Sequence, residues 1–151
     1  MTHAKFVGFL GCLVATVAMA GTPAKVEFLN SGKVYPAGVP LSEAVRVGDT
    51  LYLSGQIGIQ PGTLKLVPGG IGAESRQAMS NIRTSLEAHG YSMSDVVKCT
   101  VMLADIAKWG DFNDVYKTFF GGHFPARSAM GVNGLAVGAQ VEVECTAHKA
   151  R

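Results

Sequence analysis

The order of the hydrophobic patterns along the chain constrains the fold more than any other feature. Residues 43–58, EAVRVGDTLYLSGQIG, alternate apolar and polar side chains on both sides of a Gly-Asp turn, which is typical of two strands. From residue 73 to residue 89 the apolar side chains recur at helical spacing, and Gly90 stands where a helix ends. The apolar run at 95–103, rich in β-branched residues, then predicts a buried strand.

A second amphipathic helix is predicted at 108–122, KWGDFNDVYKTFFGG, where two glycines end the pattern. Its apolar stripe consists of Trp109, Phe112, Val115 or Tyr116, and Phe119. An aromatic stripe at helical spacing is more often core than a ligand pocket, so we interpret this one as core.

Two further strands are predicted after this helix, at 126–132 and 139–149. In the second, Glu142, Glu144 and Thr146 share the face opposite Val141, Val143 and Cys145. The order strands, helix, strand, helix, strands predicts an α+β domain with two helices packed on one face of a mixed sheet. The other face of such a sheet needs cover, and a homo-oligomer is the natural source of it.

Length and charge limit the classes of protein that the chain can belong to. Its 151 residues suit a single domain, and no linker or repeat divides residues 21–151. Apolar residues make up 48% and charged residues 16%, so the chain can bury a core. The net charge is +2, and the basic residues are scattered instead of forming a stripe, which argues against a nucleic-acid binder.

The N-terminus has the layout of a secretory signal peptide. A basic start precedes a nearly continuous apolar run that ends in Ala18-Met19-Ala20, a small-x-small cleavage site. The run is shorter than the about 20 residues of a membrane span. We expect residues 1–20 to be cleaved and residues 21–151 to be periplasmic or secreted, without a membrane anchor. The alternative is a first buried helix, and the protein would be cytoplasmic if the signal were not used.

Cleavage would leave two cysteines, Cys99 and Cys145, each in a strand-like run. An exported protein could pair them, but a buried free thiol also behaves as a small hydrophobe, and this second interpretation is the one that we favour. The histidines do not cluster with either cysteine at metal-ligand spacing, so we expect no metal site.

Four motifs, in this order and spacing, resemble the RidA family, also called YjgF or L-PSP. They are SGQ after a strand, VYxxFF at a helix end, PAR[ST] and VEVE, and the resemblance runs from about residue 26 to residue 147. It implies a chorismate-mutase-like α+β fold with a mixed six-stranded sheet. It also implies a homotrimer whose three ligand clefts lie between subunits.

The resemblance also implies roles for individual residues. Arg127, in PARS, would bind the carboxylate of a small 2-imino or 2-keto acid, and Glu142, the first Glu of VEVE, would position the attacking water. Three further residues match positions that line the cleft: Asn113, Ser54 and Gly55.

Two positions depart from the family pattern. Leu41 stands where many members have a tyrosine that covers the substrate, and Ala129 replaces a cysteine common near the arginine. Both departures concern the choice of substrate more than the reaction.

The chemistry of these residue types agrees with the resemblance. A guanidinium can hold a carboxylate through two parallel hydrogen bonds, and a carboxylate can serve as general base toward water. Such a hydrolysis of a 2-imino acid to a 2-keto acid and ammonia requires no cofactor.

Three alternatives stay open at this point. Arg127 and Glu142 could form a structural ion pair between neighbouring strands. The cleft could capture a small carboxylate without turnover. An endoribonuclease or translation inhibitor would require a basic surface, which the scattered charges do not favour.

Overall fold

The computed structural model describes Met1 and residues 23–149. Apart from Met1, the predicted signal peptide at 1–20, with its cleavage site, lies outside the described residues. Within the described part, no helix is long and apolar enough to cross a membrane.

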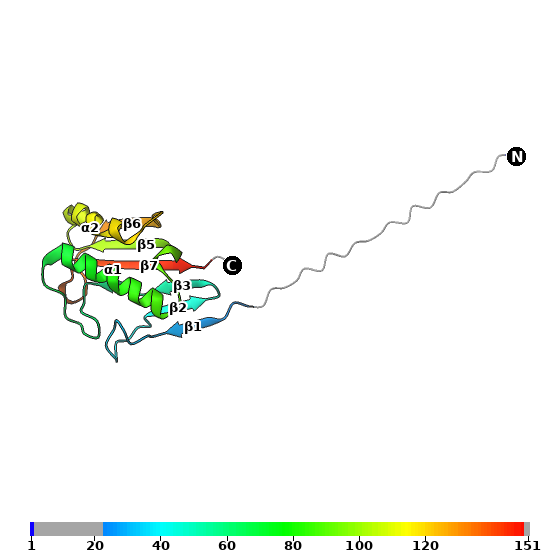
Figure 1. The fold of residues 1–151 in the computed structure, drawn as a ribbon, viewed down its shortest axis with the longest axis horizontal. Helices are drawn as coiled ribbons and strands as arrows, with labels where there is room; N and C mark the ends of the chain where they lie inside the picture. The colour runs from blue at the N-terminus through cyan, green and yellow to red at the C-terminus, as the bar shows by residue number, and fades with distance from the viewer. Residues whose placement is uncertain (2–22, 150–151) are drawn as a thin grey trace.

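Seven strands form one mixed sheet (Figure 1). They are β1 (Val26–Leu29), β2 (Ala44–Val47), β3 (Thr50–Leu53), β4 (Gln56–Ile57), β5 (Val96–Leu103), β6 (Ala126–Gly131) and β7 (Val141–His148). The order is β1-β2-β3-β7-β5-β6, β4 pairs with β7, and only β5 and β6 run parallel. The six-stranded path implied by the resemblance is therefore present, and β4 adds a seventh strand of two residues.

Two α-helices lie on the same face of this sheet (Figure 1). Helix α1 spans Gly70–Ala88, and Gly90 follows it with a positive φ of 82°, as the predicted helix end requires. Helix α2 spans only Trp109–Tyr116, and short 3-10 turns extend it on both sides, at Ile106–Lys108 and Lys117–Phe119. Two further 3-10 turns lie at Met93–Asp95 and Ala136–Gly138.

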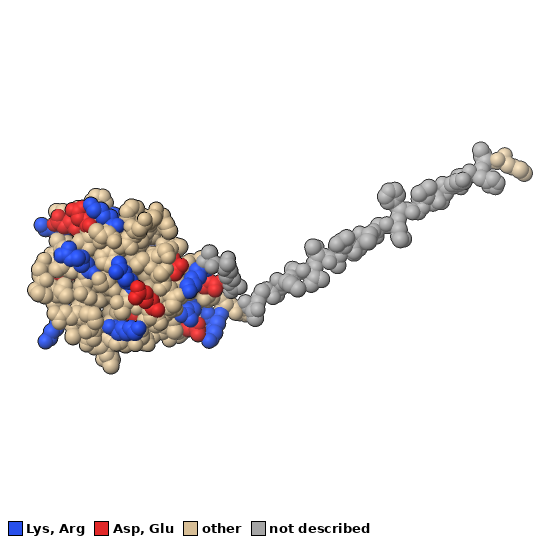
Figure 2. Space-filling model, in the orientation of Figure 1, with Lys and Arg blue, Asp and Glu red and all other residues tan. Residues whose placement is uncertain are grey.

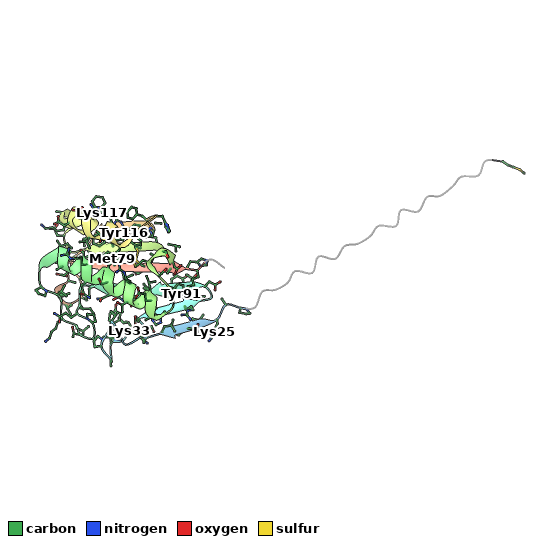
Figure 3. The ribbon with its side chains drawn as sticks, in the orientation of Figure 1. Lys25, Lys33, Met79, Tyr91, Tyr116 and Lys117 are labelled. Atoms are coloured by element: carbon green, nitrogen blue, oxygen red, sulfur yellow. A yellow bond between two sulfur atoms is a disulfide. The ribbon has the colours of Figure 1, made fainter. Side chains whose placement is uncertain are left out.

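The core lies between the helices and the sheet. Met79 of α1 and Phe112 of α2 are fully buried against Val101 and Val143 of the central strands. Figure 3 labels Met79 and Tyr116, which come from the two different helices. The alternation predicted for β7 is confirmed, since its apolar residues are buried and Glu142 and Glu144 alternate with them.

The two cysteines form a disulfide, so the favoured interpretation as free thiols is wrong. Cys99 on β5 and Cys145 on β7 are direct partners in the antiparallel register, with Cα atoms 4.1 Å apart. Both side chains point into the helix-side core and are 0% and 1% exposed. Each strand alone resembled a site for a buried thiol, and only the register brings the two sulfurs together.

The face of the sheet away from the helices carries exposed apolar side chains. Leu29, Ala44 and Leu53 pack into the helix-side core, so the alternate residues of β1, β2 and β3 point to the opposite face. Among these, Phe28 is 73% exposed and Tyr52 is 50% exposed. An apolar surface of this kind is typical of an association surface.

Charged side chains do not gather into a broad patch on the face seen in Figure 2. Lysine and arginine are interspersed there with aspartate and glutamate. Salt bridges such as Lys117–Asp114, 2.8 Å between Nζ and Oδ1, pair opposite charges at the surface.

Candidate active site

Arg127 lies on β6, at the edge of the sheet, and points to the helix side. In the parallel register it is the partner of Cys99, which is buried in the helix-side core. Paired residues of neighbouring strands point to the same face, so the Arg127 side chain runs toward α2.

Aromatic rings surround the guanidinium of Arg127. Its Cζ lies 4.5 Å from the ring centroid of Tyr116, 5.8 Å from that of Phe112 and 5.9 Å from that of Trp109. Each of these distances is within cation–π range. The prediction that the whole α2 stripe is core is therefore wrong at one end, because Trp109 is 46% exposed and flanks the arginine.

Two cavities open on either side of this guanidinium. One, of about 450 Å³, is lined by Ile106, Trp109, Arg127 and Ala129. The other, of about 440 Å³, is lined by Asn113, Tyr116, Lys117, Phe124, Pro125 and Arg127. Arg127, Asn113 and Ala129, three of the predicted site residues, are thus brought together, and with Trp109 and Tyr116 we call them the Arg127 half-site.

The polar groups of the Arg127 half-site are unpaired within the described chain. The salt bridges found among the described residues do not include Arg127. The Oδ1 of Asn113 and the hydroxyl of Tyr116 are buried and have no hydrogen-bond partner among these residues. Burial raises the pKa of Tyr116, and the positive charge of Arg127 partly offsets this, so the hydroxyl is a neutral donor. The half-site therefore offers the Arg127 guanidinium and the Tyr116 hydroxyl as donors and the Asn113 Oδ1 as an acceptor, with no anion bound among the described residues.

Glu142 lies on the opposite face of the sheet. Its neighbours on β7, Val141 and Val143, are both buried in the helix-side core, so the Glu142 side chain between them points away from the helices. It pairs with Met102 on β5 and with Ile57 on β4.

The carboxylate of Glu142 lies directly against the backbone of Gly55. A Cβ atom built at Gly55 would be 2.0 Å from Oε1 of Glu142 and 2.9 Å from its Cδ. Only glycine leaves room for the carboxylate here, which gives the predicted site residue Gly55 a physical role.

Burial raises the pKa of Glu142, and the nearby charge of Glu144 raises it further. A carboxylate whose pKa is raised toward neutrality is a stronger base than an ordinary surface carboxylate. Because Glu142 is also partly accessible, it can reach a small molecule on this face of the sheet.

Ser54 ties the segment between β3 and β4 to the loop at residues 30–43. Its hydroxyl donates to the carbonyl of Ser42 at 2.7 Å, and its backbone N–H donates to the carbonyl of Glu43 at 3.0 Å. Ser54 therefore holds this loop beside Gly55.

Leu41 is 40% exposed and lines a cavity of about 650 Å³ with Tyr35 and Glu43. Tyr35 lies next to Gly55, since its hydroxyl donates to the Gly55 carbonyl oxygen. We call Glu142, Gly55 and Tyr35 the Glu142 half-site. Tyr35 was not predicted, because a tyrosine in an aperiodic loop before a proline gives no pattern from which its contact could be inferred.

The alternative of a structural ion pair between Arg127 and Glu142 is wrong. Their strands, β6 and β7, are separated by β5, and the two side chains point to opposite faces. One described chain therefore holds the two halves of the predicted site apart.

The described residues contain no group of three or more His, Cys, Asp or Glu side chains that could hold a metal ion. The two half-sites offer a guanidinium, hydroxyl and amide groups, and a carboxylate.

Taken together, the fold and the site define a class of protein: a small α+β domain with two helices on one sheet face and a candidate site divided between the two faces. Residues 33–149 match the sequence pattern of the Endoribonuclease L-PSP family. The chain belongs to this family, which confirms the resemblance found in the sequence.

The relatives and the solved structures agree with this assignment. The chain is 45% identical over 121 residues to the 2-iminobutanoate/2-iminopropanoate deaminase of Bos taurus, which covers 80% of this chain and 88% of the relative. It is 47% identical to the rat protein of the same name, with the same coverage. RidA from an Antarctic Psychrobacter species superposes with a TM-score of 0.77 at 36% identity and covers 82% of this chain and 99% of that one. E. coli TdcF with bound serine superposes with a TM-score of 0.76 at 28% identity and the same coverage.

Proposed function

We propose that the protein hydrolyses small 2-imino acids to 2-keto acids and ammonia. The observation that carries the proposal is the environment of Arg127. Its guanidinium lies against aromatic rings, has no carboxylate partner in the described chain and lines two cavities. Relatives that cover most of the chain are named 2-iminobutanoate/2-iminopropanoate deaminases, which supports the same reaction here.

In this proposal Arg127 binds the substrate carboxylate. The surrounding rings hold the guanidinium in place, so that its N–H groups can form two parallel hydrogen bonds to the carboxylate oxygens. The amide of Asn113 lies in the same cavity and orients the bound acid.

Glu142 acts as the general base. It accepts a proton from water as the water oxygen attacks the electrophilic carbon of the C=N bond, and it then passes this proton to the imine nitrogen. The resulting tetrahedral amino alcohol then collapses: the hydroxyl proton passes by way of Glu142 to the amino nitrogen, the C–N bond breaks, ammonia leaves, and the C=O bond of the 2-keto acid forms. Imines hydrolyse readily, so orientation and one base suffice for the acceleration.

We further propose that the active protein is a homotrimer in which Arg127 of one protomer faces Glu142 of the next. A single chain cannot bring the two residues to one ligand, because they point to opposite sheet faces. The exposed apolar face around Phe28 and Tyr52 offers a surface for such association. A cyclic assembly repeats one such contact three times and closes.

Export is also part of the proposal. The disulfide between Cys99 and Cys145 supports it, because disulfides persist mainly in oxidising compartments such as the periplasm. Mass spectrometry of the protein from its native host tests this part. We expect the mature chain to begin at Gly21.

The test of the function is a coupled assay. An amino-acid oxidase generates the 2-imino acid, semicarbazide competes for it, and the mature protein is added. We expect the protein to suppress semicarbazone formation, and Arg127→Ala to abolish this effect and the binding of 2-oxobutanoate while leaving the assembly intact.

Binding of 2-oxobutanoate by the wild type without any change in the lifetime of the imine would instead support the non-catalytic carboxylate binder. Loss of folding in Arg127→Ala, together with no carboxylate binding by the wild type, would give Arg127 a structural role only.

A further inference from the structure

Tyr35 makes a specific contact in the Glu142 half-site that the reaction, as described above, does not use. It belongs to the loop at residues 30–43, between β1 and β2, and its hydroxyl donates to the carbonyl oxygen of Gly55, between β3 and β4. The hydrogen bond joins segments twenty positions apart in the sequence.

The loop that carries Tyr35 is held at its two ends. Glu43 is 1% exposed, and its Oε2 accepts hydrogen bonds from the backbone N–H of Ser31 at 2.7 Å and from the Ser31 hydroxyl at 2.6 Å. The backbone N–H of Glu43 donates to Oδ1 of Asn30 at 2.9 Å. The loop is therefore closed at its base, which fixes the direction from which Tyr35 approaches Gly55.

Gly55 in turn lies against Glu142. The carboxylate occupies space that a side chain at residue 55 would fill, since a Cβ atom there would be 2.0 Å from Oε1. Tyr35, Gly55 and Glu142 thus form a contiguous row, in which a shift of the Gly55 backbone changes the space open to the carboxylate.

Burial and two nearby carboxylates keep the Tyr35 hydroxyl protonated. Burial raises the pKa of Tyr35, and the negative charges of Glu142 and Glu43 raise it further. The hydroxyl is therefore a neutral donor at neutral pH.

We propose that Tyr35 is a positioning residue, which fixes the Gly55 backbone against Glu142 so that the carboxylate keeps one orientation toward the attacking water. This proposal rests on the deaminase function proposed above. It assigns Tyr35 no contact with the reacting atoms.

The first test is Tyr35→Phe, which removes the hydroxyl and keeps the ring. We expect kcat for the imine to fall about tenfold with KM changed less than about twofold, because Arg127 binds the carboxylate in the other half-site and only the orientation of the base is loosened. The matched control is Tyr91→Phe. The Tyr91 hydroxyl also donates to a backbone carbonyl, that of Asp49 at 3.2 Å, and it lies beyond the end of α1 (Figure 3). This control is expected to keep the activity of the wild type.

The second test is Tyr35→Ala, read as a pH profile of kcat. Burial is the main cause of the raised pKa of Glu142, so removing the Tyr35 ring lets water in and moves the acid limb to lower pH. Among the described residues, Glu144 is the charged group that also raises the pKa of Glu142, while Met102 on β5 and Ile57 on β4 are uncharged. Glu144, and Arg127 of the neighbouring protomer in the proposed trimer, are the same in both proteins.

The outcomes separate this proposal from the function on which it rests. An active wild type together with an unchanged kcat in Tyr35→Phe, or an unmoved acid limb in Tyr35→Ala, overturns the role of Tyr35 alone. Thermal unfolding measures the fraction of Tyr35→Phe that is folded. If the loss of activity equals the loss of folded protein, the role of Tyr35 is also overturned. A wild type that hydrolyses no imine overturns both proposals.

Discussion

Substitution of Gly55 by alanine tests the geometry of the base directly. The added Cβ would lie 2.0 Å from Oε1 of Glu142, whereas side-chain carbons essentially never come closer than 3.0 Å to another heavy atom. The carboxylate oxygen therefore has to move by at least about 1 Å, since the Gly55 backbone is held by the strands on both sides.

A displacement of about 1 Å at a catalytic group can reduce the rate by about 10²-fold, so this is the loss of kcat that we expect for Gly55→Ala. The protein itself should remain stable. Glu142 is the flexible and partly accessible end of a side chain, and its movement opens no core cavity. We expect the melting temperature to change by less than about 4 °C, which corresponds to about 1 kcal/mol for a domain of this size.

The assay is the imine-lifetime assay with Gly55→Ala beside Gly121→Ala. The control position has an ordinary φ and no atom within 4 Å of an added Cβ, so alanine fits there. Activity of Gly55→Ala within about threefold of the wild type, with Glu142 intact, would refute the reasoning, because the expected loss is more than tenfold larger. A large loss of stability in Gly55→Ala would also refute it, since the contact would then be part of the packing.

Two other predictions follow from the structure. The disulfide closes a chain segment with a sequence separation of 46, which corresponds to about 4 kcal/mol of stabilisation by loop entropy. We therefore expect reduction of the disulfide, or the double substitution Cys99→Ala and Cys145→Ala, to lower the free energy of unfolding by about that amount in urea titrations. Detection of both cysteines as free thiols in the denatured, unreduced protein would contradict the disulfide. The raised pKa of Glu142 predicts that activity falls as the pH drops through that pKa. The folded protein binds the Glu142 proton more tightly than the unfolded chain does. The free energy of unfolding should therefore fall as the pH rises from 4.5, the ordinary carboxyl pKa, through the raised pKa of Glu142, and Glu142→Gln should remove this pH dependence.

The sequence alone predicted the elements with strong periodicity. Strict alternation in β7 and the unbroken apolar run of β5 were enough to predict both strands, and the helical spacing before Gly90 predicted α1 to within a few residues. It could not predict β4, because a strand of two residues has no period of its own.

The larger errors of the sequence-based prediction concern features that depend on the register between strands. The pairing of Cys99 with Cys145 and the opposite directions of Arg127 and Glu142 depend on which residues stand side by side in neighbouring strands. A single sequence carries little information on register between strands that are distant along the chain. The motif residues could therefore be named as candidates from the sequence, but their division into two half-sites could not be predicted from the residues.

The central claim is that one site is built from two chains, and mixing of two inactive variants tests it most directly. Arg127→Ala lacks one half-site and Glu142→Gln lacks the other. Co-expressed in equal amounts, they should form mixed trimers in which about a quarter of the interfaces combine an intact Arg127 with an intact Glu142. The account predicts recovery of about a quarter of wild-type activity in this mixture, with none in either variant alone. Mixed trimers without any recovered activity would contradict it.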